Sequence, residues 1–281
     1  IRASLYRMIR LFIVRGTDDV NTSQQFRWSS IVYGVGTLLS LAYLAVFLAG
    51  VLIAYRRRSA LLLFLVLRAF LVEAFKIPSG SMEGTLLIGD FLLVNKLVYG
   101  AEVPFTGRRL PAIRRPANGD ILVFQWPEDP TKALVKRLVG SPGDTLAMDG
   151  GVLIRNGVRL DEESYTRHID PNYDPTGDEF RWQRDFLVPQ AQAARTAYRP
   201  SRNNWGPLVV PQAHYFVLGD NRDNSLDSRW PSSIGVGFIP AENIVGRAEF
   251  IAWSLSGEGE LMHPSTWLHT LRGSRSFTSL R

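Results

Sequence analysis

Residues 30–55 form a predominantly apolar stretch that contains no charged residue. A bilayer core requires about 20 consecutive apolar residues in a helix. The alternative, a helix buried in a protein core, rarely reaches this length without a polar face. We therefore interpret residues 30–55 as a transmembrane helix. The run begins too late and is too long for a cleaved signal peptide.

A second, weaker apolar run covers residues 60–76 and is interrupted by Arg68 and Glu73. It fits either a second transmembrane helix or a helix lying in the membrane interface, and we favour the second span. Three arginines at residues 56–58 would then mark a cytoplasmic turn and place the following domain on the far side. The five arginines of residues 1–27 would lie on that side too, against the positive-inside tendency.

After residue 76 the pattern changes to short apolar runs separated by Gly, Pro and Asx turns, which is typical of β-strands. The run 152–160 carries Asn156-Gly157 between two apolar stretches, a strong signal for a type I′ hairpin. No long amphipathic helix lies between the runs, so this part of the chain is predicted to be mainly β. The other predicted strands are 90–95, 120–126, 133–139, 215–218 and 248–253.

Residues 161–207 are polar and weakly periodic, and we interpret them as an insertion or lesser subdomain. The residues after Ser256 are polar and are expected to fray. The predicted organisation is an N-terminal segment (1–29), a transmembrane helix (30–55), a basic turn (56–59), a weaker transmembrane helix (60–76), a main β domain (77–160 and 208–256), an inserted subdomain (161–207) and a polar tail (257–281).

The amino-acid composition limits the kinds of nucleophile, metal site and binding partner that the chain can have. The chain has no cysteine, which excludes a disulfide scaffold, a thiolate nucleophile and a cysteine-ligated zinc, and its four histidines are too scattered for a metal site. Lys and Arg total 32 against 26 Asp and Glu, and residues 1–76 hold ten of these basic and three of these acidic residues. The basic excess therefore lies beside the apolar runs, and nucleic-acid binding by the main domain is not supported.

Three segments carry candidate chemistry, and each one alone has an ordinary interpretation as a turn, an exposed strand or a loop. They are residues 75–83 (FKIPSGSME), 136–144 (KRLVGSPGD) and 219–229 (GDNRDNSLDSR). Only the three segments together therefore indicate a function.

Lys136 is the candidate general base. Alternate residues of a strand share a face, so Lys136 points with Leu134 and Leu138. Burial beside two leucines disfavours the charged ammonium and lowers the lysine pKa, which would let Lys136 accept a proton. A lysine reaching to solvent from an edge strand is the alternative.

A lysine base requires a nucleophile, and neither cysteine nor histidine occurs in the three segments. Ser–Lys pairs are a recognised alternative to Ser-His-Asp triads. Ser81 is the best candidate, because the neighbouring Gly80 lets the backbone approach a substrate closely. Ser79 is suited to donate a hydrogen bond to a developing oxyanion.

The three segments together resemble bacterial type I signal peptidase, the membrane-bound Ser–Lys leader peptidase. Its motifs Pro-Ser-x-Ser-Met, Lys-Arg-x-x-Gly-x-Pro-Gly-Asp and Gly-Asp-Asn-Arg-Asp-Asn-Ser-x-Asp-Ser-Arg occur here in order, within residues 75–253. The length of the third motif makes the combination specific. The resemblance implies a mainly β fold: a signal-peptidase-like catalytic domain with an inserted β subdomain, preceded by N-terminal transmembrane helices.

The resemblance also implies roles for individual residues. Ser81 matches the nucleophile and Lys136 the general base. Ser79 matches a hydroxyl of the oxyanion hole, beside the backbone N–H of Ser81, and Ser225 matches the serine that orients the lysine. A supporting ion pair and two apolar positions of a shallow substrate pocket match Asp227, Arg229, Ile77 and Val135.

The implied activity is that of a membrane-anchored serine endopeptidase that cleaves signal peptides from exported preproteins after Ala-x-Ala-like sequences. The implied location is the bacterial cytoplasmic membrane, multi-pass, with the catalytic domain on the outer face. The resemblance also implies contact with membrane lipid and a functional link to the export machinery. It implies no metal or organic cofactor. A related peptidase with a narrow substrate set and a non-catalytic membrane-tethered binding protein are the alternatives.

One position departs from the family pattern Ser-Met-x-Pro-Thr-Leu, because Gly84 replaces the proline. Glycine frees the backbone, so we expect the turn after Ser81 to be less rigid than in relatives.

Overall fold

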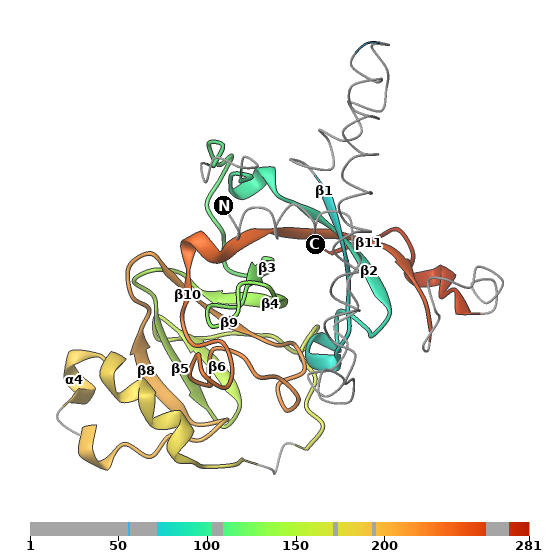
Figure 1. The fold of residues 1–281 in the computed structure, drawn as a ribbon. Helices are drawn as coiled ribbons and strands as arrows, with labels where there is room; N and C mark the ends of the chain where they lie inside the picture. Colours follow the sequence, from blue (N-terminus) through green and yellow to red (C-terminus); the bar gives the residue numbers. More distant parts are fainter. Residues whose placement is uncertain are drawn as a thin grey trace, which may run out of the picture.

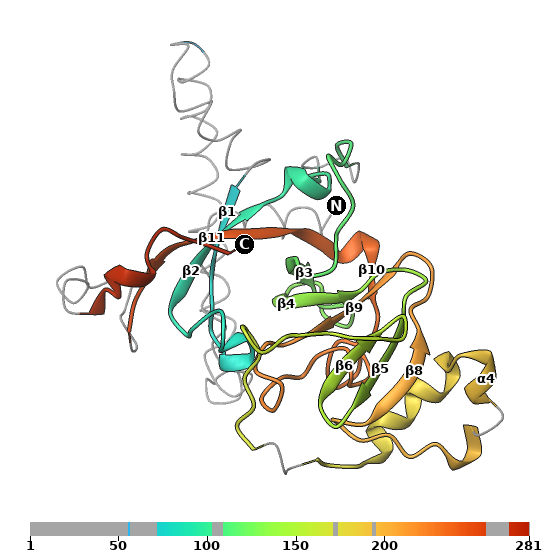
Figure 2. The ribbon, with the colours of Figure 1, turned by 180° about the vertical axis from the view of Figure 1, so that it is seen from behind.

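The computed structural model describes residues 56, 72–102, 109–170, 174–192, 195–256 and 270–280, and they form two antiparallel sheets (Figures 1 and 2). The larger sheet has eight strands in the order β1-β2-β11-β3-β4-β9-β10, with β12 paired to β11. These strands are β1 (Val72–Lys76), β2 (Asp90–Asn95), β3 (Ile121–Gln125), β4 (Ala133–Gly140), β9 (His214–Leu218), β10 (Ile239–Pro240), β11 (Ile244–Ser254) and β12 (Thr278–Ser279).

The smaller sheet has four strands in the order β7-β6-β5-β8. They are β5 (Thr145–Asp149), β6 (Val152–Arg155), β7 (Val158–Arg159) and β8 (Trp205–Val209). Figure 1 shows the helical residues that precede β8 beside this sheet. The helical segments are η2 (Gly80–Met82), η3 (Leu97–Tyr99), η4 (Asp178–Phe186), α4 (Pro189–Gln192), η5 (Arg195–Ala197), η6 (Ala241–Asn243) and η7 (Gly273–Arg275).

The mainly β prediction is confirmed, and every strand predicted after residue 76 lies within or overlaps an observed strand. The predicted hairpin is also present, with Asn156 at φ 53° and Gly157 at φ 81° between β6 and β7. Positive φ at both central positions is the requirement of a type I′ turn. The second sheet is built mainly from residues 145–159, however, and residues 161–207 contribute only the start of β8 to its strands.

The predicted helix 60–76 is wrong at its end, because residues 72–76 form strand β1. Their backbone pairs with β2 in the register Val72↔Asn95 to Lys76↔Phe91. An ion pair of 2.6 Å between Glu73 and Lys96 adds to this pairing. Residues 60–71 and the predicted helix 30–55 lie outside the described residues. Within the described part of the chain, no helix has the length and apolar character needed to span a bilayer.

The predicted fraying of the C-terminal tail is wrong for residues 270–280. β12 pairs with β11 through Phe250↔Ser279 and Ile251↔Thr278. Leu280 packs against a buried cluster that includes Ile77, Met82 and Leu86. Residues 257–269 lie outside the described residues.

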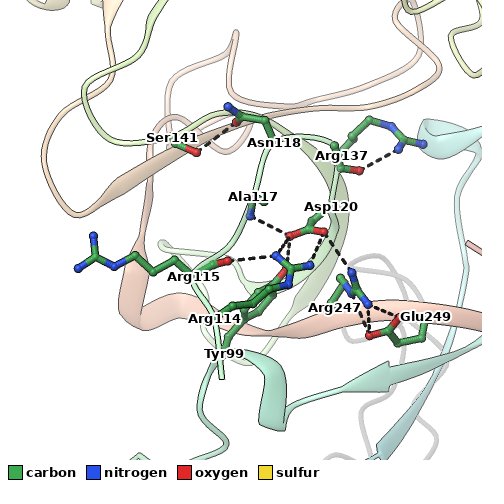
Figure 3. Close-up of polar contacts among 11 residues, drawn as sticks. Tyr99, Arg114, Arg115, Ala117, Asn118, Asp120, Arg137, Ser141, Arg247 and Glu249 are labelled. Atoms are coloured by element: carbon green, nitrogen blue, oxygen red, sulfur yellow. Dashed lines mark hydrogen bonds and ion pairs between the residues drawn. The ribbon is translucent and has the colours of Figure 1, made fainter. Parts of the chain in front are cut away.

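Asp120, just before β3, gathers a set of polar side chains that holds this corner of the larger sheet (Figure 3). It accepts hydrogen bonds from the Tyr99 hydroxyl at 2.6 Å and from Arg114 at 2.8 Å through each carboxylate oxygen. Burial, reinforced by Asp120, raises the pKa of Tyr99, so the hydroxyl keeps its proton. On the neighbouring β4, Arg137 donates to the Gly119 carbonyl at 3.0 Å (Figure 3).

Candidate active site

Ser81 lies in the one-turn helix η2, which follows β1 after a short extended segment. The turn is held by Asn221, whose backbone N–H donates to the Ser81 carbonyl and whose side-chain amide donates to the Gly80 carbonyl, both at 3.1 Å. Met82, 1% exposed, anchors the other side of the turn in the core. The Ser81 backbone is therefore fixed by the third sequence motif on one side and by the apolar core on the other.

Lys136, on β4, meets Ser81 directly. Its Nζ lies 2.8 Å from Ser81 Oγ and 3.0 Å from the Val135 carbonyl oxygen. The predicted burial is confirmed, because Lys136 is only 5% exposed. Burial lowers its pKa to about 8, against the opposing charges of Asp227 and Asp220. A neutral amine at this distance can accept the hydroxyl proton of Ser81.

Asp227 and Arg229 form the predicted ion pair, with Arg229 Nε 2.9 Å from Asp227 Oδ1 and both side chains fully buried. The second carboxylate oxygen of Asp227 accepts the Gly219 N–H at 3.0 Å. Burial alone would raise the Asp227 pKa, but the charge and hydrogen bonds of Arg229 outweigh it and hold the pKa below its ordinary value. The pair thus keeps a negative charge near Lys136 and holds the loop that follows β9.

A second buried ion pair was not anticipated from the sequence. Arg137 binds Asp220 in a bidentate manner, at 2.8 Å through Nε and 2.7 Å through Nη2. Thr85 Oγ1 donates to the same carboxylate at 2.6 Å, and the Arg137 guanidinium lies 4.0 Å from the centre of the Tyr165 ring. The only sequence signal was the presence of opposite charges in two motifs, since Thr85 and Tyr165 lie outside all three segments.

The structure also places the predicted auxiliary residues near Ser81. Ser79 is exposed, has an extended backbone just before η2, and does not cap that turn through its side chain. Ile77 is 3% exposed and shares a buried cluster with Met82, against which the half-buried Val135 packs. Residues 133–136 of β4 pair with β3, whereas the described pairing with β9 begins at Arg137.

Ser225 lies beside the dyad, but its predicted hydrogen bond to Lys136 is not formed in this structure. The residue is 7% exposed, and its Oγ has no hydrogen-bond partner among the described residues. Gly219 makes room for it: a Cβ there would lie 2.2 Å from Ser225 Oγ and 2.5 Å from the Ser81 carbonyl oxygen. Ser225 thus brings a free buried hydroxyl close to the backbone of Ser81.

Comparison with known proteins finds a matching family and several similar proteins. Residues 52–253 match the family described as signal peptidase, peptidase S26, and this range contains all three motifs. A signal peptidase I of Pseudomonas fluorescens is 39% identical over 210 residues, covering 72% of each chain. A signal peptidase I of Pseudomonas aeruginosa is 38% identical, covering 69% of this chain and 68% of that protein. One of Haemophilus influenzae is 30% identical, covering 77% and 72%.

Proposed function

We propose a catalytic mechanism on the premise that the chain belongs to the signal peptidase family, peptidase S26. It is a serine peptidase, and its family cleaves signal peptides from preproteins. In this chain, Ser81 and Lys136 perform the reaction. The observation that carries it is the 2.8 Å distance between Lys136 Nζ and Ser81 Oγ, with Lys136 buried.

In the acylation step, neutral Lys136 takes the proton of Ser81 while Oγ attacks the scissile carbonyl carbon. The resulting oxyanion is stabilised by the backbone N–H of Ser81 and the hydroxyl of Ser79. The intermediate collapses with cleavage of the C–N bond, and the Lys136 ammonium protonates the leaving amine. The mature protein leaves, and the signal peptide remains as an ester on Ser81.

In deacylation, Lys136 takes a proton from water, and the hydroxide attacks the ester carbonyl. The ester C–O bond then breaks, the Lys136 ammonium returns its proton to Ser81 Oγ, and the signal peptide departs with a free C-terminal carboxyl group. Ser225 supplies a hydroxyl that orients the Lys136 amine, and the Asp227–Arg229 pair keeps the surrounding loop in place. This scheme uses side-chain groups, the backbone N–H of Ser81 and a water molecule.

The substrate binds in extended form along residues 134–136 of β4 and the segment 77–81. Residues 133–136 of β4 pair with β3 on one side, whereas the described pairing with β9 on the other side begins at Arg137. This arrangement supports the proposal, because an extended peptide can add to the edge of a sheet through backbone hydrogen bonds. Ile77 and Val135 line a shallow apolar pocket that selects small side chains, as in Ala-x-Ala sequences. We further propose that the chain is anchored in the bacterial cytoplasmic membrane, meets exported preproteins on its outer face, and is linked to the export machinery.

Substitution of the dyad tests this proposal. Ser81→Ala and Lys136→Ala are each expected to abolish cleavage of a preprotein by the detergent-solubilised full chain, while the circular dichroism spectrum is retained. Their effects should not add, because the two groups act as one unit. Lys132→Ala is the matched control, since it removes a lysine of the neighbouring turn whose ammonium lies 3.3 Å from Asp129. Cleavage close to the wild-type rate by either dyad variant would refute the assignment.

A further inference from the structure

The C-terminal residues return to the turn that follows Ser81. The contact centres on Asp90, the first residue of β2, whose side chain is fully buried. Its carboxylate accepts the Leu87 N–H at 2.8 Å and the Arg275 guanidinium at 2.7 Å, and Arg272 lies 3.6 Å away. A buried carboxylate is tolerated when charged and hydrogen-bonded partners surround it. The two arginines are therefore the charge partners of a residue that is 185 positions away from Arg275 in sequence.

Arg275 also reaches the catalytic turn itself. The nitrogen that binds Asp90 donates a second hydrogen bond to the Thr85 carbonyl oxygen at 2.9 Å.

The side chain of Thr85 donates to Asp220, the partner of Arg137 on the strand that carries Lys136. Thr85 is thus fixed through its carbonyl by the C-terminal segment and through its hydroxyl by the ion pair beside the dyad. Since its N–H also donates to the Met82 carbonyl at 3.0 Å, its position sets the path of the chain leaving Ser81.

Arg272 fastens the same segment at a second point. It donates to the Ile88 carbonyl at 2.5 Å, to the Leu255 carbonyl at 2.8 Å and to Ser254 Oγ at 2.7 Å. The last two residues belong to the end of β11 and its continuation. Arg272 therefore ties residues 85–90 to β11, and Arg275 sits one helical turn further along the chain.

We infer that Arg275, with Arg272 and Asp90, forms a C-terminal clasp that positions the Ser81 turn for catalysis. The clasp consists of these three residues and acts through Thr85, without touching substrate. The inference rests on the proposed dyad mechanism. Loosening the clasp lets the Ser81 turn shift relative to Lys136, and a misplacement of about 1 Å of a reacting group costs on the order of hundredfold in rate. The effect falls mainly on kcat, because Arg275 acts on the turn after Ser81 through Thr85. The peptide-binding segment 77–81 is held to residues 89 and 90 by backbone hydrogen bonds of Ile77, which do not involve the Arg275 side chain.

The test compares Arg275→Met and Arg275→Lys in the full-length, detergent-solubilised chain. Turnover and KM are measured on a preprotein and normalised to the folded fraction. We expect Arg275→Met to lower kcat by on the order of ten- to hundredfold with KM within about twofold of wild type. Arg275→Lys retains the charge and should recover part of the rate. It also provides a folded variant should the methionine variant be unstable.

Arg114→Met is the matched control, because Arg114 makes a bidentate pair with Asp120 and has a side-chain exposure of 35%, close to the 28% of Arg275. It should lower the melting temperature while retaining kcat per folded molecule. Unchanged kcat in Arg275→Met, or an equal loss in Arg114→Met, would overturn the clasp. Wild-type enzyme and Ser81→Ala are assayed in parallel. If Ser81→Ala remained active, the dyad mechanism would fail, and this outcome is distinct from failure of the clasp.

Combining Arg275→Met with Asp90→Asn provides an independent check. If the two residues act together, the double variant should be no slower than the slower single variant. A fully additive loss of kcat would show that Arg275 acts on turnover without Asp90 and would contradict the clasp.

Discussion

The side chain of Lys136 combines burial with a 2.8 Å contact to Ser81, and in the proposed mechanism this combination sets the pH dependence of the reaction. Burial lowers the Lys136 pKa to about 8, and only the neutral amine is a base. The value of kcat/KM should therefore rise about tenfold per pH unit below about pH 8 and level off above it, whereas an unperturbed lysine would place this rise at about pH 10.4. The measurement is kcat/KM against pH on a preprotein, because this ratio reports the pKa values of the free enzyme. A rise centred near about pH 6.5 that disappears when a histidine is replaced would contradict the lysine base.

Ser225 allows a sharp separation of catalytic and structural roles, because its buried hydroxyl has no partner among the described residues. Removing an unsatisfied hydroxyl should not reduce stability. We therefore expect Ser225→Ala to leave the melting temperature unchanged or higher while turnover falls by on the order of ten- to hundredfold, through loss of one hydrogen bond to the Lys136 amine during the reaction. Thermal unfolding and turnover are measured on the same preparation.

Ser228, in the same loop, is the matched control for Ser225. Its hydroxyl accepts the Val217 N–H at 2.9 Å, so Ser228→Ala should lower the melting temperature and retain turnover per folded molecule. Unchanged turnover in Ser225→Ala would remove Ser225 from the catalytic site.

At the scale of elements, the turn after Ser81 has a conformation that requires glycine at position 84. Gly84 has φ +118°, and a Cβ there would lie 2.2 Å from the Tyr165 carbonyl oxygen. Any side chain would meet both an unfavourable backbone conformation and a steric clash, and proline cannot adopt this φ. We expect Gly84→Ala to destabilise the protein by about 1–2 kcal/mol from the backbone and a further ~1–3 kcal/mol from the clash.

Gly119 separates the two contributions, because it has φ +96° and nothing lies within 4 Å of a Cβ built there. Gly119→Ala should therefore show only the backbone cost of about 1–2 kcal/mol. Urea unfolding of both variants provides the comparison. Equal losses of stability would show that the contact with Tyr165 does not constrain the turn.

The strands that the sequence predicts well are those whose local pattern agrees with their environment. β3 is buried on both faces and is a continuous apolar run, and the β6–β7 turn carries the Asn156-Gly157 pair that its geometry requires. β1 was predicted as helix because its residues continue a long apolar run, and its strand form depends on pairing with β2. β5 and β8 are strands of five residues that pair across more than 50 positions of sequence, so their pairing depends on segments far apart in the chain.

At the scale of the whole molecule, the dyad was predictable because each residue lies in a motif, whereas most of its supports were not. Arg137 and Asp220 are 83 positions apart, and Arg275 and Asp90 are 185 apart. Each of these pairs exists because the sheet brings two distant segments together, and an arginine alone does not specify which carboxylate it will meet. The motifs of the sequence therefore predict the proposed reacting groups, whereas the residues that surround them follow from the fold.

Membrane attachment is a prediction for the whole chain, made from the apolar run 30–55. The full chain should remain in the membrane pellet after extraction with alkaline carbonate. β1 begins at Val72, so a variant that lacks residues 1–71 keeps every described strand. It should be released by carbonate and should still cleave a preprotein in detergent. A variant that lacks only residues 1–29 is the control and should stay in the pellet, because it keeps the apolar run. Release of the full chain by carbonate would show that residues 30–55 do not span the bilayer.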